Sequence, residues 1–147
     1  MVITTSINPF LLAGAALSFI ASFLHVGILF GGASWLRFFG AGEAMAQMAE
    51  RGEAWPYIVT SLIAAVLFVW GLYALKGAGL IQSLPLPLLR LGLLAIAMVF
   101  ITRGLVLVPA LLGVSQLSDV FWIITSAICL MMGMSYAIGL AQKWSEL

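Results

Sequence analysis

Charge is the scarcest feature of this 147-residue chain. Only 7% of its residues are Asp, Glu, Lys or Arg, whereas 64% are hydrophobic and the mean hydropathy is +1.21. A soluble domain carries charge on roughly a quarter of its residues, so this composition predicts an integral membrane protein whose main partner is the lipid bilayer. The net charge of +1 gives no reason to expect nucleic acid as a partner.

Cysteine and histidine occur only once each, as Cys129 and His25. A single cysteine excludes an internal disulfide and a dithiol redox centre within one chain. A single histidine excludes a bis-histidine haem site in a monomer. No metal site is expected, because imidazole and thiolate ligands normally cluster, and the sequence identifies no cofactor. The amino terminus lacks the basic region of a cleavable signal peptide, so we expect the first helix to remain in the mature protein.

Four apolar stretches are long enough to cross a membrane as helices, which takes about 20 residues for roughly 30 Å of hydrocarbon. They cover, to within a few positions, residues 10–31, 55–75, 88–110 and 119–140. Asn8-Pro9 precedes the first stretch, and Ser118 is the expected N-cap of the last. No stretch resembles a strand, a second domain or an internal repeat. We therefore predict an all-α fold, a four-transmembrane-helix bundle that forms a single membrane domain over residues 1–147.

The connection between the first two spans has the periodicity of an amphipathic helix. Its bulky apolar residues are Trp35, Phe38, Phe39, Met45 and Met48, and its polar residues are Glu43, Gln47, Glu50 and Arg51. The segment is too short and too polar to span, so we predict a helix over residues 35–49 that lies in the outer interface. Gly40 and Gly42 permit a break in this helix, and a re-entrant turn is the alternative.

Few basic residues are present to set the orientation in the membrane. If both termini are cytoplasmic, the cytoplasmic side carries Lys76, Arg90 and Lys143, and the opposite side carries Arg37 and Arg51. The positive-inside rule favours this arrangement by three residues to two, so we predict an N-in, C-in topology.

Arg103 stands within the third apolar stretch. Its guanidinium keeps its charge, so in hydrocarbon it needs a counter-charge, a polar cavity or a ligand. At 1.5 Å per residue, His25 and Arg103 lie roughly 7 Å and 6 Å outward of their helix midpoints, at nearly the same depth. We predict that both residues line one polar cavity in the outer half of the membrane. A structural role for Arg103, bonded to helix carbonyls or paired with Asp119, is the alternative.

Further candidate ligand-binding residues follow from the helix faces expected to point inward. His25 continues a stripe of small residues, Gly14, Ser18 and Ser22, at spacings typical of close helix contacts. The fourth span places on one face Asp119, Trp122, Ser126, Cys129, Gly133 and Tyr136. We expect Tyr57 and Trp122 to enclose the cavity, with Asp119 and Glu43 near its mouth. The aromatic residues equally suit a membrane-interface belt, and Glu43 suits a solvated surface.

The stretch HVGILFGGASWLRFFGAGE, from His25 to Glu43, and the later TRGL around Arg103 resemble a group of small bacterial four-helix membrane proteins. The similarity would cover most of the chain, and the first stretch is its most distinctive part. The resemblance implies a bacterial inner-membrane location and draws attention to Trp35 and Arg37 beside the residues already named. It implies no activity, so catalytic residues stay unassigned.

Three functions fit these observations. The leading hypothesis is a binding protein or accessory subunit that holds a lipid-like, quinone-like or other amphipathic small-molecule ligand, with Arg103 on its anionic or carbonyl group and His25 adding a hydrogen bond. The second is a small membrane enzyme acting on a lipid-like substrate, with His25 as general acid/base and Glu43 or Asp119 as its partner. The third is a transporter or channel protomer, which would need a homo-oligomer or another membrane-complex partner to form a pathway.

Overall fold

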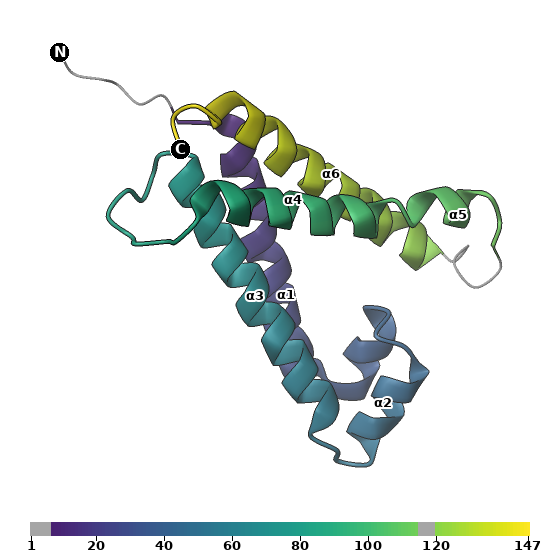
Figure 1. Ribbon diagram of the computed structural model, residues 1–147. Helices are drawn as coiled ribbons and strands as arrows, with labels where there is room; N and C mark the ends of the chain where they lie inside the picture. Colours follow the sequence, from purple (N-terminus) through teal and green to yellow (C-terminus); the bar gives the residue numbers. More distant parts are fainter. Residues whose placement is uncertain (1–6, 115–119) are drawn as a thin grey trace. The chain divides into compact units, whose positions relative to one another are not determined.

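The computed structural model describes residues 7–114 and 120–147, and all regular secondary structure within them is helical. The helices of this part of the chain are α1 (Pro9–Phe38), α2 (Glu43–Glu50), α3 (Trp55–Gly77), α4 (Leu89–Gly104), α5 (Leu107–Leu111) and α6 (Val120–Lys143) (Figure 1). Four segments are long and apolar enough to cross a membrane: α1, α3, α6 and the stretch Leu89–Leu111. The predicted all-α class with four spanning helices is confirmed, and the chain is a multi-pass membrane protein.

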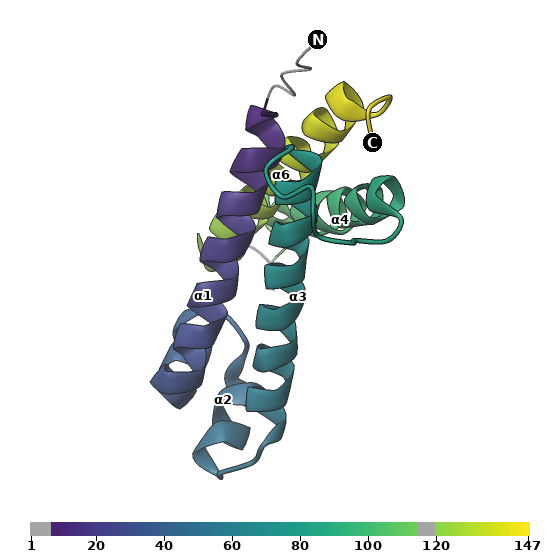
Figure 2. The same cartoon turned by 90° about the vertical axis from the view of Figure 1, so that its left-hand side faces the viewer.

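The chain folds into two compact units. The first contains residues 7–18, 70–114 and 120–147, and the second contains residues 19–69. α1 and α3 run side by side in both views, and each helix contributes to both units (Figures 1 and 2).

Tyr136 on α6 marks the point in the first unit where parts of all four spanning segments meet. Its side chain is fully buried, and its hydroxyl donates to the carbonyl oxygen of Trp70 on α3 over 3.0 Å. Ser18 on α1 therefore donates to the Tyr136 oxygen, at 2.8 Å. The ring packs against Phe100 of α4, with centroids 5.7 Å apart. Because a buried phenol needs polar partners in an apolar setting, these contacts specify how the four helices of the bundle meet.

Asn8 ties the start of α1 to the ends of α3 and α6. Its side-chain oxygen accepts a hydrogen bond from the Leu11 N–H at 2.9 Å, and its amide donates to Gln142 at 2.9 Å. Its backbone N–H donates to the Ala78 carbonyl oxygen at 3.1 Å. Pro9 follows at the first helical position, where the missing N–H leaves no bond unmade. The predicted helix start after Asn8-Pro9 is confirmed.

α4 and α6 pack closely along each other (Figure 1). A Cβ atom added to Gly104 would lie only 2.6 Å from the backbone nitrogen of Leu130. Only glycine permits so close an approach of two helices. The contact lies directly beside Arg103, so it brings the side chains of α6 within reach of that residue.

The third spanning segment is interrupted at Leu105 and Val106, between α4 and α5. Pro109 explains the position of the break. Proline lacks an N–H and its ring clashes with the carbonyl group four residues earlier, here that of Leu105. The sequence predicted a span over about residues 88–110 that fades from Pro109 to Gly113. The structure has this span at Leu89–Leu111 and adds a break at Leu105 and Val106 that was not predicted.

In the second unit, α1 and α3 are joined by one polar and one aromatic contact. The Ser22 hydroxyl donates to the Ala64 carbonyl oxygen at 2.8 Å, and the Phe19 and Phe68 rings meet edge to face with centroids 5.2 Å apart. Ser18 and Ser22 are both buried. The prediction that the small-residue stripe of the first helix faces inward is therefore confirmed.

The connection between α1 and α3 is helical but is not one helix. α1 kinks at Gly32, whose φ of 62° and ψ of −147° belong to a region that essentially only glycine adopts, and it continues to Phe38. The chain then turns at Gly40 and Gly42, with φ of 71° and 93°, before α2 begins. The prediction of a single helix over residues 35–49 is corrected: the segment is divided at the two glycines that permit a break.

α2 keeps the predicted amphipathic character. Its Ala46 is fully buried in a small apolar cluster with Ile28 and Leu36 of α1. Gln47 and Glu50 of the same helix are exposed. The amphipathic segment expected between the first two spans is therefore present, anchored to α1 by its apolar face.

Candidate ligand-binding site

Arg103 lies in the last turn of α4 and is partly buried against α6. Its Nη1 donates to the Ser126 hydroxyl at 2.9 Å, and its Nη2 donates to the Thr125 hydroxyl at 3.3 Å. The guanidinium carbon stands 4.7 Å from the centroid of the Trp122 ring, within cation–π distance. Two hydroxyls and one aromatic ring, all from α6, thus contact the guanidinium.

The spacing on α6 explains why these three residues act together. Thr125 and Ser126 follow Trp122 by three and four positions, so all three project from one side of the helix. Ser126 is fully buried, and the Thr125 hydroxyl donates to the Phe121 carbonyl oxygen at 2.9 Å, which leaves its lone pairs for Arg103. The Thr125 hydroxyl is therefore positioned as an acceptor before any ligand arrives.

Hydroxyl groups satisfy hydrogen-bond donors of Arg103 but do not neutralise its charge. A guanidinium has five N–H donors, and the two hydroxyls use only part of them. Within the residues that the structure describes, the ion pairs are Arg37 with Glu43 and Glu50, Arg51 with Glu53, and Lys143 with Glu146. None of these pairs within the described residues includes Arg103, and its expected alternative partner Asp119 lies outside them.

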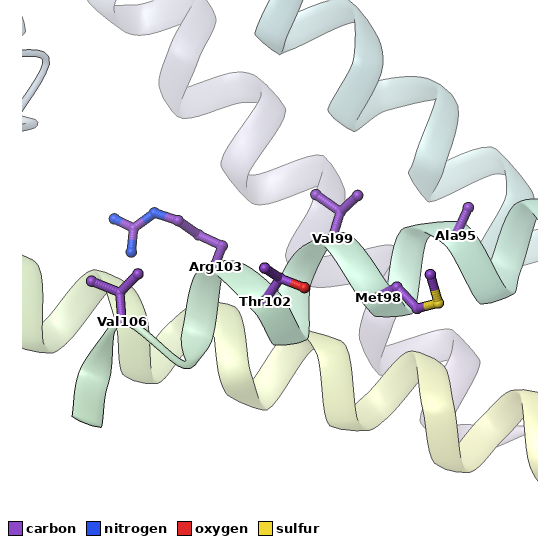
Figure 3. A pocket seen from close by; sticks show the side chains of 6 residues that line it. All are labelled: Ala95, Met98, Val99, Thr102, Arg103 and Val106. Atoms are coloured by element: carbon purple, nitrogen blue, oxygen red, sulfur yellow. The ribbon is translucent and has the colours of Figure 1, made fainter. Parts of the chain in front are cut away.

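An open groove of about 600 Å³ runs along α4 and has Arg103 near one end (Figure 3). Its lining consists of Ala95, Met98, Val99, Thr102, Arg103 and Val106. Apart from Thr102 and Arg103 the lining is apolar, and Figure 3 shows Ala95 and Met98 toward the end away from the guanidinium. Such a groove suits an elongated molecule that has an apolar body and one polar end.

His25 belongs to the second unit and lies half-buried on α1. Its Nδ1 is 2.8 Å from the Ala21 carbonyl oxygen. A carbonyl only accepts hydrogen bonds, so Nδ1 carries a proton and Nε2 is the nitrogen left for other partners. The expectation that His25 shares a cavity with Arg103 stays a prediction, since the two residues belong to different units.

Trp35 and Tyr57 lie beside the glycines at the kink of α1. The Trp35 indole lies so close to Gly31 that a Cβ atom added to this glycine would overlap with the ring. The Tyr57 hydroxyl would be 3.9 Å from a Cβ atom added to Gly32. These positions give both aromatic residues a packing role at the kink. Their predicted contact with a ligand stays a prediction.

Glu43 is held by Arg37 rather than standing alone. Arg37 donates from Nε and Nη2 to the two Glu43 carboxylate oxygens at 2.8 and 2.7 Å, and from Nη1 to Glu50 at 2.6 Å. The hydrogen bonds from Arg37 lower the pKa of both carboxyls below their ordinary value of 4.5. Glu43 is therefore an ionised group that joins the end of α1 to α2.

Of the predicted site residues, the structure brings Arg103 and Trp122 together. Asp119 lies outside the described residues. Thr125 was missing from the predicted site, and Ser126 had been placed on the correct face of α6 without a role. The available signal was a pair of hydroxyl residues one turn after Trp122. Within the described residues, no group of three His, Cys, Asp or Glu side chains is placed to hold a metal ion.

Comparisons with protein-family models, characterised proteins and solved structures found no match to this chain.

Proposed function

We propose that the protein is a binding protein or accessory subunit of the bacterial inner membrane, with both termini in the cytoplasm. It holds a lipid-like, quinone-like or other amphipathic ligand in the groove along α4, with the polar end of the ligand at Arg103. One observation carries the proposal: a permanently charged guanidinium, positioned by two hydroxyls and an indole face, stands at the end of an apolar groove.

The groove and the guanidinium supply the two complementary parts of such a site. The apolar side chains offer contact area to a hydrocarbon or isoprenoid body, and the arginine offers directed donors and charge to its polar group. Trp122 and Ser126 restrict the rotation of the guanidinium, which lowers the conformational entropy lost on binding. A preorganised arginine of this kind supports ligand recognition more than simple anchoring at the membrane surface.

The alternative of an enzyme with His25 as acid/base receives less support. Such an enzyme needs a partner group for the imidazole. Both oxygens of Glu43, one of the two expected partners, are bonded to Arg37. The remaining expected partner, Asp119, lies outside the described residues. Binding without chemistry is therefore the function that we propose.

Arg103→Leu tests the proposal, with Arg90→Leu as a matched control. Arg90 also lies on α4 and also has an aromatic partner, since its guanidinium carbon is 5.8 Å from the Trp144 ring. Protein purified in mild detergent is examined by native mass spectrometry for co-purifying amphiphiles. We expect adducts on the wild type and on Arg90→Leu, and a loss of about tenfold or more on Arg103→Leu, because removing a charge-assisted hydrogen bond costs about 1.5–3 kcal/mol.

Misfolding of Arg103→Leu is not expected to cause the loss of adducts. Leucine is better tolerated in hydrocarbon than arginine by about 2.5–3.5 kcal/mol on insertion scales, so Arg103→Leu should reach the membrane at least as well as the wild type. Equal adducts on all three proteins would refute the role of Arg103. Absence of any amphiphile from the wild type, after purification and after added lipid and quinone, would refute the function itself.

A further inference from the structure

We propose that the groove binds an anionic phospholipid of the surrounding bilayer, with the phosphate on Arg103 and one acyl chain along α4. This inference rests on the proposed function and narrows it, because it separates an anionic lipid from a neutral quinone. Three observations lead to it: the charge and donors of Arg103, the polarity of the groove along the membrane normal, and the exposure of its apolar lining.

The charge of Arg103 selects an anion over a neutral carbonyl. Its partners on α6 are the hydroxyls of Thr125 and Ser126, which accept hydrogen bonds without carrying charge. A quinone carbonyl would satisfy one further donor and bring no negative charge to it. A phosphate oxygen pair satisfies donors and charge together, in the planar fork geometry that guanidinium favours.

The guanidinium of Arg103 has more donors than its contacts with Thr125 and Ser126 use. The guanidinium carbon lies over the Trp122 ring, 4.7 Å from its centroid, a contact that uses none of the N–H donors in a hydrogen bond. Each of the two terminal nitrogens carries two N–H groups, so a single bond to a hydroxyl leaves a second donor on each nitrogen. These further donors belong to a residue that lines the groove.

The groove runs along a spanning helix and has its charge on one side of the helix midpoint. The spanning stretch Leu89–Leu111 has its midpoint at Phe100, so Arg103 lies on the Leu111 side and Ala95 on the other. At 1.5 Å per residue, Arg103 and Ala95 are about 12 Å apart along the helix. By the same count Arg103 lies about 4.5 Å from the midplane and Ala95 about 7.5 Å beyond it, so an acyl chain along the groove crosses the midplane, and a phosphate at Arg103 is drawn inward from the interface.

The apolar lining is exposed on a membrane-spanning helix. Met98 and Val99 expose 58% and 50% of their surface, and both side chains line the groove. An acyl chain of the bilayer is the apolar material that surrounds such a helix. An arginine within a span draws lipid headgroups and water toward itself, so a phosphate at Arg103 also accounts for how this charge is accommodated.

A competition measured by native mass spectrometry tests the assignment. Delipidated protein in a neutral detergent is mixed with equal amounts of phosphatidylglycerol, phosphatidylethanolamine with the same chains, and a short-chain ubiquinone analogue. We expect phosphatidylglycerol adducts to exceed those of the ubiquinone analogue by about tenfold, and to exceed those of phosphatidylethanolamine by less, because its phosphate is the same and only its ammonium group offsets the charge. Arg103→Gln should abolish this preference, and Arg90→Gln should retain it.

A second variant tests the groove without touching the charge. Val99→Trp fills the space where the acyl chain would lie and should reduce phosphatidylglycerol binding severalfold. Leu91→Trp is the control, because Leu91 is similarly exposed on α4, at 57%, and does not line the groove. If Arg103→Gln does not fold, the comparison of Val99→Trp with Leu91→Trp still tests whether the lipid occupies the groove.

The outcomes separate this inference from the function on which it rests. If the ubiquinone analogue binds as well as phosphatidylglycerol in an Arg103-dependent way, the anionic lipid is wrong and the amphiphile-binding function stands. Displacement of phosphatidylglycerol by millimolar inorganic phosphate would show that an ion alone is recognised, and would overturn the lipid assignment. If Arg103→Gln still prefers phosphatidylglycerol over the other two amphiphiles, the lipid binds at a site that does not include Arg103. Binding of no amphiphile would overturn both proposals.

Discussion

Arg37 and Arg103 each lie in the last turn of a helix, and their charges are accommodated in opposite ways. Arg37 donates to two exposed carboxylates at the end of α1, and exposed pairs of this kind contribute little to stability. Arg103 lies within a spanning segment and is held by hydroxyls and an indole face. The first arrangement neutralises its charge and joins two helices. The second presents charge to the groove, which is why we place ligand recognition at Arg103.

The hydrogen bond from Arg103 to Ser126 gives a prediction at the scale of a single residue. Ser126→Ala removes a buried acceptor and leaves a guanidinium donor without its partner. We expect a loss of about 1 kcal/mol in the free energy of unfolding, within the range measured for hydrogen bonds inside membrane proteins. Unfolding by a denaturing detergent, followed by the tryptophan fluorescence, measures this change.

Ser135→Ala is the matched control for Ser126→Ala. Ser135 lies on the same helix, is half-buried, and donates to the Met131 carbonyl oxygen of its own helix at 3.0 Å. Its replacement should change the free energy of unfolding by less than about 0.5 kcal/mol, as surface substitutions usually do. Equal effects of the two substitutions would mean that the contact of Ser126 with Arg103 contributes nothing specific.

At the scale of single residues, the sequence identifies Arg103 as a charge within an apolar segment but does not identify the hydroxyl side chains that contact it. Arg103 is conspicuous because charge is rare inside an apolar run, and Trp122 follows from the face of its helix. Thr125 and Ser126 are not conspicuous, since hydroxyl residues are common in spanning helices. Their role depends on how α4 and α6 are rotated and how closely they approach at Gly104, and no pattern within either helix encodes that relation.

At the scale of elements, α2 is attached to α1 by an apolar cluster and by the ion pairs of Arg37. Glu43 and Glu50 are the first and last residues of α2, so a single guanidinium contacts both ends of the helix. The ion pairs are exposed and the apolar cluster is small. We therefore expect α2 to be the helix whose attachment responds most readily to solution conditions.

The lowered pKa values of Glu43 and Glu50 set the pH range of that response. Each carboxyl is held below its ordinary pKa of 4.5 by Arg37, so the stabilisation is present above about pH 4.5 and is lost as the pH falls through the lowered folded-state pKa. We expect hydrogen exchange of the α2 amides, corrected for intrinsic rates, to be constant from pH 8 to about pH 5 and to accelerate only at lower pH.

Arg37→Gln should remove this dependence and speed exchange in α2 already at neutral pH. Arg51→Gln is the control, because Arg51 pairs with Glu53 outside α2. Added salt should weaken the effect of Arg37, as expected for exposed charges. Acceleration that begins near pH 7 in the wild type would rule out the glutamates as the titrating groups.

The breaks in the helices were predictable to different degrees. The break between α1 and α2 could be predicted from Gly40 and Gly42, because glycine readily adopts positive φ values. Both glycines have positive φ values in the structure. The kink of α1 at Gly32 was not evident, since glycine is common in spanning helices and this one lies among other small residues. Pro109 marks the end of the third span, but its effect falls on the carbonyl group of Leu105, one turn earlier.

At the scale of the whole molecule, hydropathy was sufficient to find four spans, because about 20 apolar residues are needed to cross a bilayer. The packing of the helices in the first unit depends instead on single polar residues. Tyr136 links α6 to α1 and α3, and Asn8 links the start of α1 to Gln142. Such links join residues more than 60 positions apart, so they are invisible to periodicity within one helix.

The four spans make a prediction about topology that is independent of orientation. Single cysteines are introduced into a Cys129→Ser background at Gln47 on α2, at Ser83 in the connection between α3 and α4, and at Ser145 after α6. All three positions are exposed. Two spans separate Ser83 from Ser145, so both cysteines should react alike with a membrane-impermeant maleimide, whereas Gln47→Cys should react on the opposite side. Disagreement between Ser83→Cys and Ser145→Cys would contradict the number of spans.

The same labelling then decides the orientation. With both termini in the cytoplasm, Gln47→Cys should be labelled in intact bacterial cells, and Ser83→Cys and Ser145→Cys only after the inner membrane is permeabilised. This result would place the Leu111 side of the third span, and with it Arg103, toward the outer leaflet. Labelling of Ser83→Cys in intact cells would reverse the orientation and assign the lipid headgroup at Arg103 to the cytoplasmic leaflet. The binding proposal would survive that reversal, because the groove and its charge run the same way along α4 in either case.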